Sequence, residues 1–330
     1  MNKFLNFINA FIFIVLVTAC TKQNEPTPLD VDIQLQRSDD YFANLRAYKK
    51  SPHQIYFGWF GGTGTPGSPD FPGVLDGIPD SVDIVSLWGG IPPLGSYNHN
   101  LLQKTRTLKG TKFVWPVFGS GVEQLMKKND NALFQSDVMA AIDKVAKAIA
   151  DTVAKYNIDG FDLDYEPSFG DNSIFGDSGG YATNDEHTQR LFKALSQYLG
   201  PKSGTDKVLI IDGQGDVGIG EYISYFMQQA YGASSGSNLQ NRLQQYGGGG
   251  IPAEKFVPCE NFEDYWRNGG VNFNDPLRGT IPSLLGFAYW QPTGRQKAGI
   301  GSYHTEYEYA LTPDYYYTRR AIQIMNPAAK

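Results

Sequence analysis

Acidic and apolar side chains alternate through residues 158–167 of this 330-residue chain. The acids are Asp162, Asp164 and Glu166, and the residues around them are Phe161, Leu163 and Tyr165. Successive side chains of a β-strand point to opposite faces, so the pattern predicts a strand with one acidic face and one apolar face. An apolar face suits packing against helices, and the acidic face then points into a barrel interior or a pocket.

Three carboxyl groups on one face cannot all ionise without cost, because neighbouring negative charges raise one another's pKa. At least one of them is therefore expected to be protonated near neutral pH. Glu166 is nearest the carboxyl end of the strand and is the candidate general acid, with Asp164 ionised or sharing a proton beside it. Asp159 has the opposite parity, which favours a structural role. The alternative is a solvated strand face, or an edge strand protected by charge.

The spacing of the acids also constrains the reaction they could catalyse. Positions two apart on a strand lie about 6.6 Å apart on the same side. Two such carboxyl groups do not easily flank a sugar ring, whereas a double-displacement glycosidase needs an acid and a nucleophile on opposite sides of the scissile bond. The substrate itself is then a candidate source of the nucleophile.

The segment from Asp159 to Glu166 resembles the D-x-x-D-x-D-x-E signature of glycoside hydrolase family 18, a family of chitinases and endo-β-N-acetylglucosaminidases. The resemblance implies a (β/α)₈ barrel and a retaining, substrate-assisted mechanism. Glu166 would protonate the leaving oxygen while the 2-acetamido oxygen of the substrate attacks and forms an oxazolinium ion. Asp164 would orient the acetamido group, and Asp162 would tune the charge of Asp164. Glu166 would then act as base toward water.

Apolar runs alternate with helical segments along the chain, which favours a single (β/α)₈ TIM barrel with long βα loops. The expected strands are residues 55–60, 84–88, 113–118, 158–167, 208–212, 222–231, 256–259 and 284–290. The expected helices are residues 38–49, 99–107, 136–157 (with Ser136 as its cap), 185–199 and 314–325. Residues 168–184 and 232–250 are expected to be long loops at the catalytic face.

Residues at the carboxyl ends of barrel strands are candidates for substrate binding, because barrel enzymes build their sites there. Trp59 and Asp212 end expected strands one and five. Trp290 ends expected strand eight and resembles the tryptophan that forms the floor of the family 18 site. For the tryptophans, packing in the core is the alternative interpretation.

Expected strand six ends in Gln229-Ala230-Tyr231. Family 18 chitinases carry Met-x-Tyr-Asp at this place, whereas many endo-β-N-acetylglucosaminidases resemble Gln-x-Tyr, with the tyrosine hydroxyl bonding the acetamido oxygen. The resemblance therefore implies a catalytic role for Tyr231 and a substrate-binding role for Gln229. Alternatively, both side chains pack or hydrogen-bond within the barrel.

The amino terminus resembles a bacterial lipoprotein signal, with a short apolar run followed by Val17-Thr18-Ala19-Cys20. This predicts a signal peptide at residues 1–19, a lipidated Cys20 with a flexible tether at 20–37, and a catalytic barrel at 38–330. The expected location is extracytoplasmic, anchored by lipid to a bacterial membrane, either the outer membrane or the cell surface. An ordinary signal peptide that leaves Cys20 as a free thiol is the alternative.

Charge and composition argue against several other classes of protein. The formal net charge is −6 and the basic residues are dispersed, which argues against a nucleic-acid-binding surface. Cys259 is the only other cysteine, and the four histidines are scattered without metal-ligand spacing, so neither a metal nor a cofactor is implied. We expect a monomer.

Together these features predict a lipid-anchored endo-β-N-acetylglucosaminidase that cleaves the β-1,4 bond in the chitobiose core of N-linked glycans. Its partners would be glycoprotein N-glycans or other glycans that contain N-acetylglucosamine. One alternative is a chitinase with the same mechanism. The other is a sugar-binding barrel without catalytic activity, which the presence of Glu166 disfavours.

Overall fold

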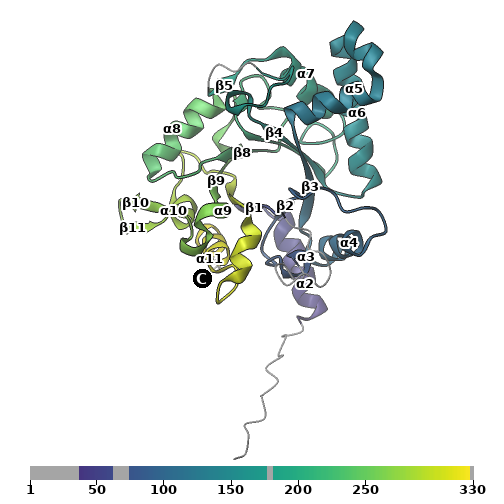
Figure 1. Cartoon of the computed structure of the whole chain (residues 1–330). Helices are drawn as coiled ribbons and strands as arrows, with labels where there is room; N and C mark the ends of the chain where they lie inside the picture. The colour runs from purple at the N-terminus through teal and green to yellow at the C-terminus, as the bar shows by residue number, and fades with distance from the viewer. Residues whose placement is uncertain (1–36, 62–73, 177–180, 328–330) are drawn as a thin grey trace, which may run out of the picture. The chain divides into compact units, whose positions relative to one another are not determined.

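In the computed structural model, which describes residues 37–61, 74–176 and 181–327, eight parallel strands close into a barrel (Figure 1). Around the barrel the order is β1-β12-β9-β8-β6-β4-β3-β2. The strands are β1 (Ile55–Trp59), β2 (Ile84–Ser86), β3 (Lys112–Phe118), β4 (Gly160–Tyr165), β6 (Val208–Gly213), β8 (Tyr225–Gln229), β9 (Phe256–Asn261) and β12 (Gly299–Tyr303). The predicted (β/α)₈ barrel is confirmed.

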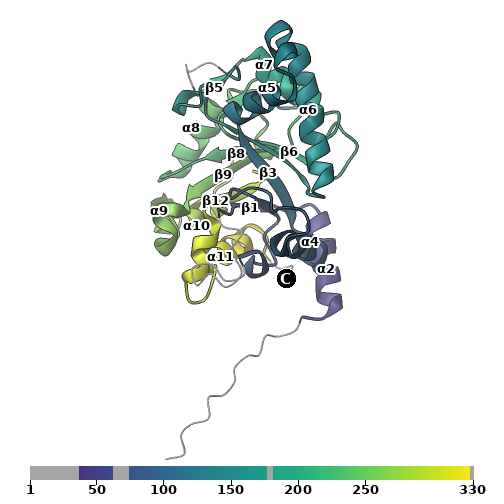
Figure 2. The same cartoon turned by 45° about the vertical axis from the view of Figure 1, so that its right-hand side comes forward.

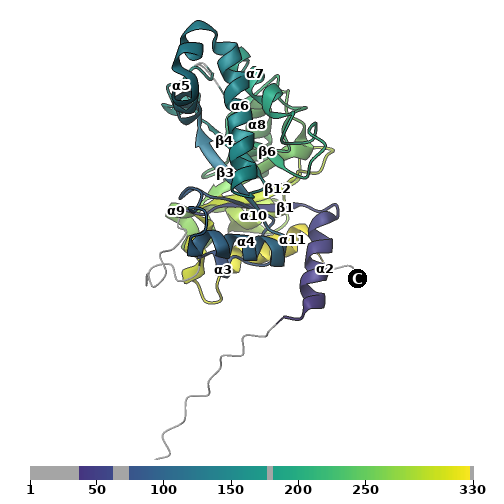
Figure 3. The same cartoon turned by 90° about the vertical axis from the view of Figure 1, so that its right-hand side faces the viewer.

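Helices occupy most of the connections between these strands, one more precedes β1 and another follows β12. They are α2 (Asp39–Lys50), α3 (Val74–Gly77), α4 (Tyr97–Lys109), α5 (Gly119–Ser136), α6 (Val138–Lys155), α7 (Glu186–Leu195), α8 (Gly236–Gly247), α9 (Phe262–Tyr265), α10 (Ser283–Tyr289) and α11 (Tyr316–Met325). Figures 2 and 3 show α5, α6 and α7 packed side by side outside the strands. Residues 214–224 connect β6 to β8 without a helix.

Short 3₁₀ helices and two small sheets complete the described elements. They are η1 (Pro167–Phe169), η2 (Ala253–Lys255), η3 (Trp266–Asn268), η4 (Thr305–Ala310), the parallel pair β5 (Ala182–Thr183) and β7 (Gly215–Asp216), and the hairpin β10 (Asn272–Asp275) with β11 (Gly279–Pro282). The described residues from Phe42 onward form one compact unit. Cys20, the expected signal peptide and nearly all of the expected tether lie outside the described residues.

Two apolar layers hold the barrel, one between the strands and the helices and one inside the strands. On β4 the outer layer receives Phe161, Leu163 and Tyr165, each fully buried. The inner layer is built from other strands, with Phe57, Trp59, Ile84, Val114, Ile210, Met227 and Cys259 among its members. The inward positions of β4 are therefore the two aspartates, as the alternation predicted.

The helix predicted at 136–157 is confirmed as α6, but its cap is Asp137 rather than Ser136. The Asp137 side chain accepts a hydrogen bond from the Ala140 amide, and residues at three- and four-residue intervals are buried against the barrel. Ser136 instead ends α5, where its hydroxyl donates to the Ala132 carbonyl. Because α5 was not predicted, Ser136, which ends α5, was taken as the residue that caps α6.

The prediction of strand eight at 284–290 is wrong. These residues form α10, and strand eight is β12. Most of α10 is buried, including Leu284, Gly286, Phe287 and Ala288, and a helix buried on nearly all sides has the same continuous apolar pattern as a buried strand. β12 contains two glycines, which gives it little of the apolar signal that marks a strand.

The prediction of a loop over residues 232–250 is also wrong, because α8 occupies most of it. Ser235 caps α8 by accepting a bond from the Asn238 amide, and Gly248 ends it with a φ of 56°. Few apolar residues mark this helix, and Leu239 and Leu243 are its buried ones together with Gly247. The loop expected at 168–184 contains η1 and β5, and residues 177–180 of it lie outside the described residues.

None of the helices in the described part of the chain is long and apolar enough to cross a membrane.

Candidate active site

The three acids of the β4 segment lie where the alternation places them. Asp162 and Asp164 point into the barrel and are 0% and 2% exposed. Glu166 follows the last residue of β4, is partly exposed, and occupies the position before η1. The strand thus carries its acids from the barrel interior outward to its carboxyl end, where barrel enzymes bind their substrates.

Two neighbouring strands bring further predicted residues to these acids. In the sheet register Asp164 pairs with Asp212 of β6, which is fully buried. Gln229, at the end of β8, donates from Nε2 to Oδ1 of Asp212 at 3.0 Å and lines the same cavity as Glu166. Asp212 lies in hydrogen-bonding range of both Asp162 and Asp164. Strands β4, β6 and β8 therefore unite these five residues in one network.

Burial raises the pKa of every acid in this network. For Asp162 the pKa rises to about 7, although hydrogen bonds from the Ser86 hydroxyl at 3.0 Å and from Trp59 oppose the shift. Burial, and after it the neighbouring carboxyl groups, hold the pKa of Asp164 and of Asp212 well above the ordinary range.

The pKa of Glu166 is raised mainly by burial, with a hydrogen bond from Gln229 opposing the shift and the nearby Asp171 adding to it. A carboxyl group with a raised pKa holds its proton to higher pH, which is what a general acid requires near neutrality.

A cavity of about 400 Å³ opens beside Glu166. It is lined by Glu166, Phe169, Gly213, Gln228, Gln229, Tyr231, Arg242 and Tyr246. The predicted residues Gln229 and Tyr231 thus share this cavity with the predicted acid. It is large enough for one or two sugar rings, and its mouth carries Phe169, which is 66% exposed.

Arg242 of α8 holds the segment that carries Gln229 and Tyr231. Its two terminal nitrogens donate to the backbone carbonyls of these residues, each at 3.1 Å. This role of Arg242 was not predicted, because α8 itself was not predicted. Recognition of Arg242 requires knowledge that α8 packs beside the end of β8.

Tyr303, which ends β12, forms the centre of an aromatic cluster at the carboxyl ends of the strands. Its ring lies 6.3 Å from that of Trp59, 5.6 Å from that of Trp88 and 6.2 Å from that of Tyr231, measured between centroids. Tyr303 therefore has the strand-eight position that was assigned to Trp290. The sequence missed it because the strand itself was misplaced.

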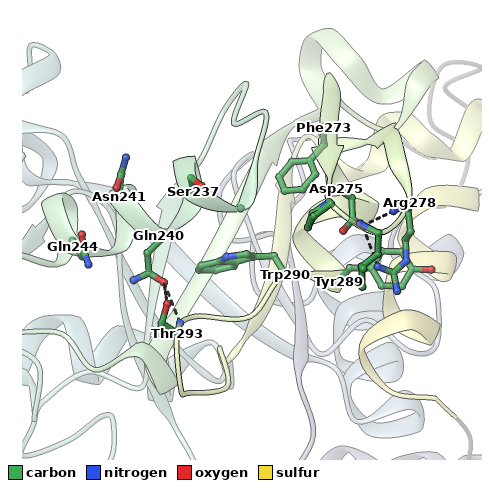
Figure 4. Close-up of a pocket in the computed structure, with 13 residues that line it drawn as sticks. Ser237, Gln240, Asn241, Gln244, Phe273, Asp275, Arg278, Tyr289, Trp290 and Thr293 are labelled. Atoms are coloured by element: carbon green, nitrogen blue, oxygen red, sulfur yellow. Dashed lines mark hydrogen bonds and ion pairs between the residues drawn. The ribbon is translucent and has the colours of Figure 1, made fainter.

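Trp290 lies outside this site, and its prediction as the site floor is wrong. It follows α10, and its ring packs edge-on against Phe256, the first residue of β9, with centroids 6.0 Å apart. Figure 4 shows it in a separate groove of about 610 Å³, between Gln240 and Thr293 on one side and Asp275 and Tyr289 on the other.

The groove and the cavity lie on different faces of α8. Ser237, Gln240 and Gln244 line the groove, whereas Arg242 and Tyr246 line the cavity beside Glu166. At 3.6 residues per turn these two sets point to nearly opposite sides of the helix.

Trp59, another predicted substrate-binding residue, is 2% exposed and hydrogen-bonds Asp162. Its position ties it to the acids, and its contact with a sugar stays a prediction. Within the described ranges no cluster of His, Cys, Asp and Glu has a geometry that could hold a metal ion.

Gly213 allows the backbone after Asp212 to pass close to Glu166. Its φ is +80°, and a Cβ at this position would lie 2.8 Å from the Tyr165 carbonyl oxygen and 3.2 Å from Cγ of Glu166. The next residue, Gln214, binds Ser168 through both its amide oxygen and nitrogen, which fixes the turn after Glu166. These contacts set the position of Glu166 from the neighbouring strand.

Comparison with known proteins is consistent with this geometry. The family model described as glycoside hydrolase family 18, BT1044-like, matches residues 24–324. Endo-beta-N-acetylglucosaminidase F2 of Elizabethkingia meningoseptica is 30% identical over 96% of each chain. A solved structure of BT1044 has a TM-score of 0.74 at 28% identity, covering 88% of this chain and 93% of that one.

A variant endo-beta-N-acetylglucosaminidase from Cordyceps militaris, solved in complex with fucosyl-N-acetylglucosamine-Asn, is also similar. It has a TM-score of 0.64 at 26% identity, and the match covers 88% of this chain and 97% of that one. Chitinases are also found at 12–14% identity, and these matches concern the fold alone.

Proposed function

The chain belongs to glycoside hydrolase family 18 and is a glycoside hydrolase, and from this premise we propose that it is an endo-β-N-acetylglucosaminidase acting on N-linked glycans. The bond cleaved is the β-1,4 linkage within the N,N′-diacetylchitobiose core. The observation that carries this proposal is that Gln229, which donates to Asp212, lines one cavity together with Glu166 and Tyr231.

The similar proteins support the same substrate class. Endo-beta-N-acetylglucosaminidases are found at 30% and 26% identity over nearly the whole chain, and the ligand in one of them is N-acetylglucosamine linked to asparagine and fucose. That ligand has the form of the product that remains on a protein after cleavage within the core. The Gln-x-Tyr segment of this chain matches that group rather than the chitinases.

In the first step Glu166 donates its proton to the glycosidic oxygen that leaves. Burial raises the pKa of Glu166, so this carboxyl group holds its proton to higher pH than an ordinary glutamate does. The carbonyl oxygen of the substrate's own 2-acetamido group attacks the anomeric carbon from the opposite face. The bond to the leaving sugar breaks as the bond to the acetamido oxygen forms, which gives an oxazolinium ion.

Asp164 and Tyr231 act on the acetamido group during this step. The Asp164 carboxyl accepts from the acetamido N–H and balances the positive charge that develops on the ring, and the Tyr231 hydroxyl donates to the acetamido oxygen. Asp162 lies behind Asp164, held by Ser86 and Trp59, and limits the charge on the pair.

In the second step Glu166 accepts a proton from water as the water oxygen attacks the anomeric carbon. The acetamido group is released unchanged, and the sugar keeps its original anomeric configuration because the carbon is attacked twice. Glu166 ends the cycle protonated, ready for the next substrate.

The proposal is tested by digestion of defined glycopeptides and of chitin oligomers, followed by mass spectrometry. We expect peptides that retain a single N-acetylglucosamine and no chitobiose from chitin oligomers. Release of chitobiose with intact glycopeptides would replace the proposed substrate with chitin. A glycopeptide whose reacting sugar carries a free amine in place of the acetamido group should resist cleavage, since it lacks the attacking oxygen.

We also propose that Cys20 carries a lipid that anchors the enzyme to the outer face of a bacterial membrane. Val17-Thr18-Ala19 before this cysteine supports the proposal. Metabolic labelling of the expressed full chain with a palmitate analogue should modify the wild type and spare Cys20→Ser. Equal labelling of both proteins would exclude Cys20 as the site.

A further inference from the structure

A fourth carboxyl group, Asp212, joins the three acids of the β4 segment from the neighbouring strand. We propose that Asp212 is a positioning residue that keeps its proton on Oδ2 and donates it in a hydrogen bond to Asp164, so that Asp164 can work as the ionised partner of the acetamido group. This inference rests on the proposed function for its catalytic consequence. Its structural basis is the contact between Asp212 and the β4 aspartates.

The first observation is a set of carboxyl oxygens that have no donor among the described residues. They are Oδ1 of Asp162, Oδ1 of Asp164 and Oδ2 of Asp212, and all three are buried. Ionised carboxylates only accept hydrogen bonds, so carboxylates in contact with one another repel. A proton on one of them turns this repulsion into a hydrogen bond. Asp212 is the member in hydrogen-bonding range of both others.

The second observation assigns the proton to one oxygen of Asp212. Gln229 donates to Oδ1 at 3.0 Å, and an oxygen that accepts from an amide acts as the carbonyl oxygen of a protonated carboxyl group. Oδ2 is then the hydroxyl oxygen. It is the buried atom of Asp212 that lacks a partner among the described residues, and it is free to donate.

The third observation is the unequal supply of donors to the acids. Asp162 receives bonds from Ser86 and Trp59, both of which favour its charged form. Asp212 receives one, from the neutral Gln229, and lies fully buried. Asp164 lies opposite Asp212 in the sheet register and within its hydrogen-bonding range. A proton on Asp212 therefore lies where it stabilises negative charge on Asp164.

Among the described residues, the charged groups that act on Asp212 are acids rather than cations that could replace this proton. The titratable groups that face it are Asp162, Asp164 and Glu166 from the β4 segment, Tyr231 after β8, and Cys259 of β9. All of these are acidic groups. An ionised Asp212 would add a negative charge beside Asp164 and oppose its ionisation.

The test compares Asp212→Asn with Asp212→Ala in the full chain, with kcat and kcat/KM on a glycopeptide measured across pH. Asparagine can accept from Gln229 through Oδ1 and donate to Asp164 through Nδ2. We expect Asp212→Asn to keep kcat within about tenfold of the wild type, with little change in the acidic limb of its pH profile, because its amide still donates to Asp164. Asp212→Ala should lose about a hundredfold or more, with its acidic limb at higher pH, because ionised Asp164 has lost its donor.

Equal losses in the two variants with an unchanged pH profile would overturn the proposal, and so would wild-type activity in Asp212→Ala. Circular dichroism melts verify that each variant is folded. Glu308→Gln is the matched control, because Glu308 is another buried acid with a raised pKa but bonds Thr318 away from the network. Its acidic limb should not move.

A second measurement separates this inference from the proposed function. Carboxyl ¹³C signals of labelled aspartate, followed from pH 4 to 9 without substrate, should show Asp164 and Asp212 titrating as a coupled pair, and Asp212→Asn should leave Asp164 with a single titration step. If this coupling is seen while no glycopeptide is cleaved, the proposed function alone fails. If the wild type cleaves glycopeptides but the two aspartates titrate independently, the role of Asp212 is overturned.

Discussion

The two ends of the β4 segment both carry buried aspartates, but their surroundings are opposite. At the amino end, Asp159 accepts a bidentate pair of hydrogen bonds from Arg106 at 2.7 to 2.9 Å and a third from the Phe113 amide. Lys207 lies 3.7 Å away. Every charge at this end has a partner of the opposite sign or a backbone donor.

At the carboxyl end, no cation of the described ranges acts on Asp162 or Asp164. Each has one buried oxygen without a donor in the described part of the chain, and the nearest charged groups are further acids. A carboxylate with a structural role is stabilised by hydrogen-bond donors to both of its oxygens. At this site the buried carboxyl groups have fewer donors than that. The contrast indicates that the inner acids are retained for chemistry and that Asp159 is retained for the fold.

The largest effect on catalysis is expected for a substitution of Glu166, at the carboxyl end. Glu166→Gln keeps the shape of the side chain and its place beside Gln229 but removes the proton that protonates the leaving oxygen. We expect kcat to fall by about a thousandfold or more, with little change in thermal stability. Glu186→Gln, an exposed substitution in the first turn of α7, is the control and should retain full activity. Turnover by Glu166→Gln near the wild-type rate would remove Glu166 from the mechanism.

At the other end, Asp159→Asn should affect the fold rather than the reaction. The substitution leaves Arg106 without its charged partner in a largely buried place, and such a loss costs about 3 kcal/mol in the free energy of unfolding. Urea denaturation measures this cost, and kcat of the folded fraction should stay near that of the wild type. A control is Asp151→Asn, which removes an exposed pair with Lys147 and should cost well under about 1 kcal/mol. A large fall in kcat for Asp159→Asn would contradict a purely structural role for Asp159.

The β4 segment could be predicted because its signal is local. The alternation of three acids with three apolar residues specifies the strand, the direction of each side chain and the position of Glu166 without knowledge of any neighbour. The Gln229 and Tyr231 pair was found for the same reason, since both lie at the end of one apolar run.

The barrel strand that was missed, β12, depends on neighbours far away in sequence. Gly301 of β12 has no space for a side chain, because a Cβ there would lie 2.6 Å from the Phe57 carbonyl oxygen and 2.8 Å from Sγ of Cys259. That requirement is invisible in the local composition, which reads as a loop. The roles of Tyr303 and Arg242 could not be predicted for the same reason, because each depends on a packing partner from another element.

A smaller perturbation, Gly213→Ala, tests how tightly the catalytic end is built. The residue has a positive φ, and a methyl group would press on Tyr165 and on Glu166, so we expect a loss of about 2 kcal/mol in stability. We also expect a fall in kcat from displacement of Glu166. Gly204→Ala is the control, because its φ of +72° carries a similar strain but nothing lies within 4 Å of its Cβ. Equal kcat values for the two variants would mean that Gly213 acts through strain alone.

The weakest expected effect is the pH dependence that Asp162 gives to stability. Its pKa is raised to about 7 in the folded protein, against roughly 4 in an unfolded chain, so the folded state holds the proton more tightly. The stabilisation from Asp162 is therefore complete below about pH 4 and is lost as the pH rises through 7. Asp162→Asn removes this dependence, so its stability relative to wild type should rise between pH 5 and pH 8.

Urea midpoints at these two pH values measure the change, and a constant difference between the proteins would contradict it. Ser86→Ala provides the sharper comparison. It removes a hydrogen bond that favours the ionised form of Asp162, so the pKa of Asp162 should rise further and the loss of stability should move to higher pH. An unchanged window in Ser86→Ala would show that burial alone sets the pKa of Asp162. The raised pKa of Asp162 would then result from its position inside the barrel rather than from its hydrogen bonds.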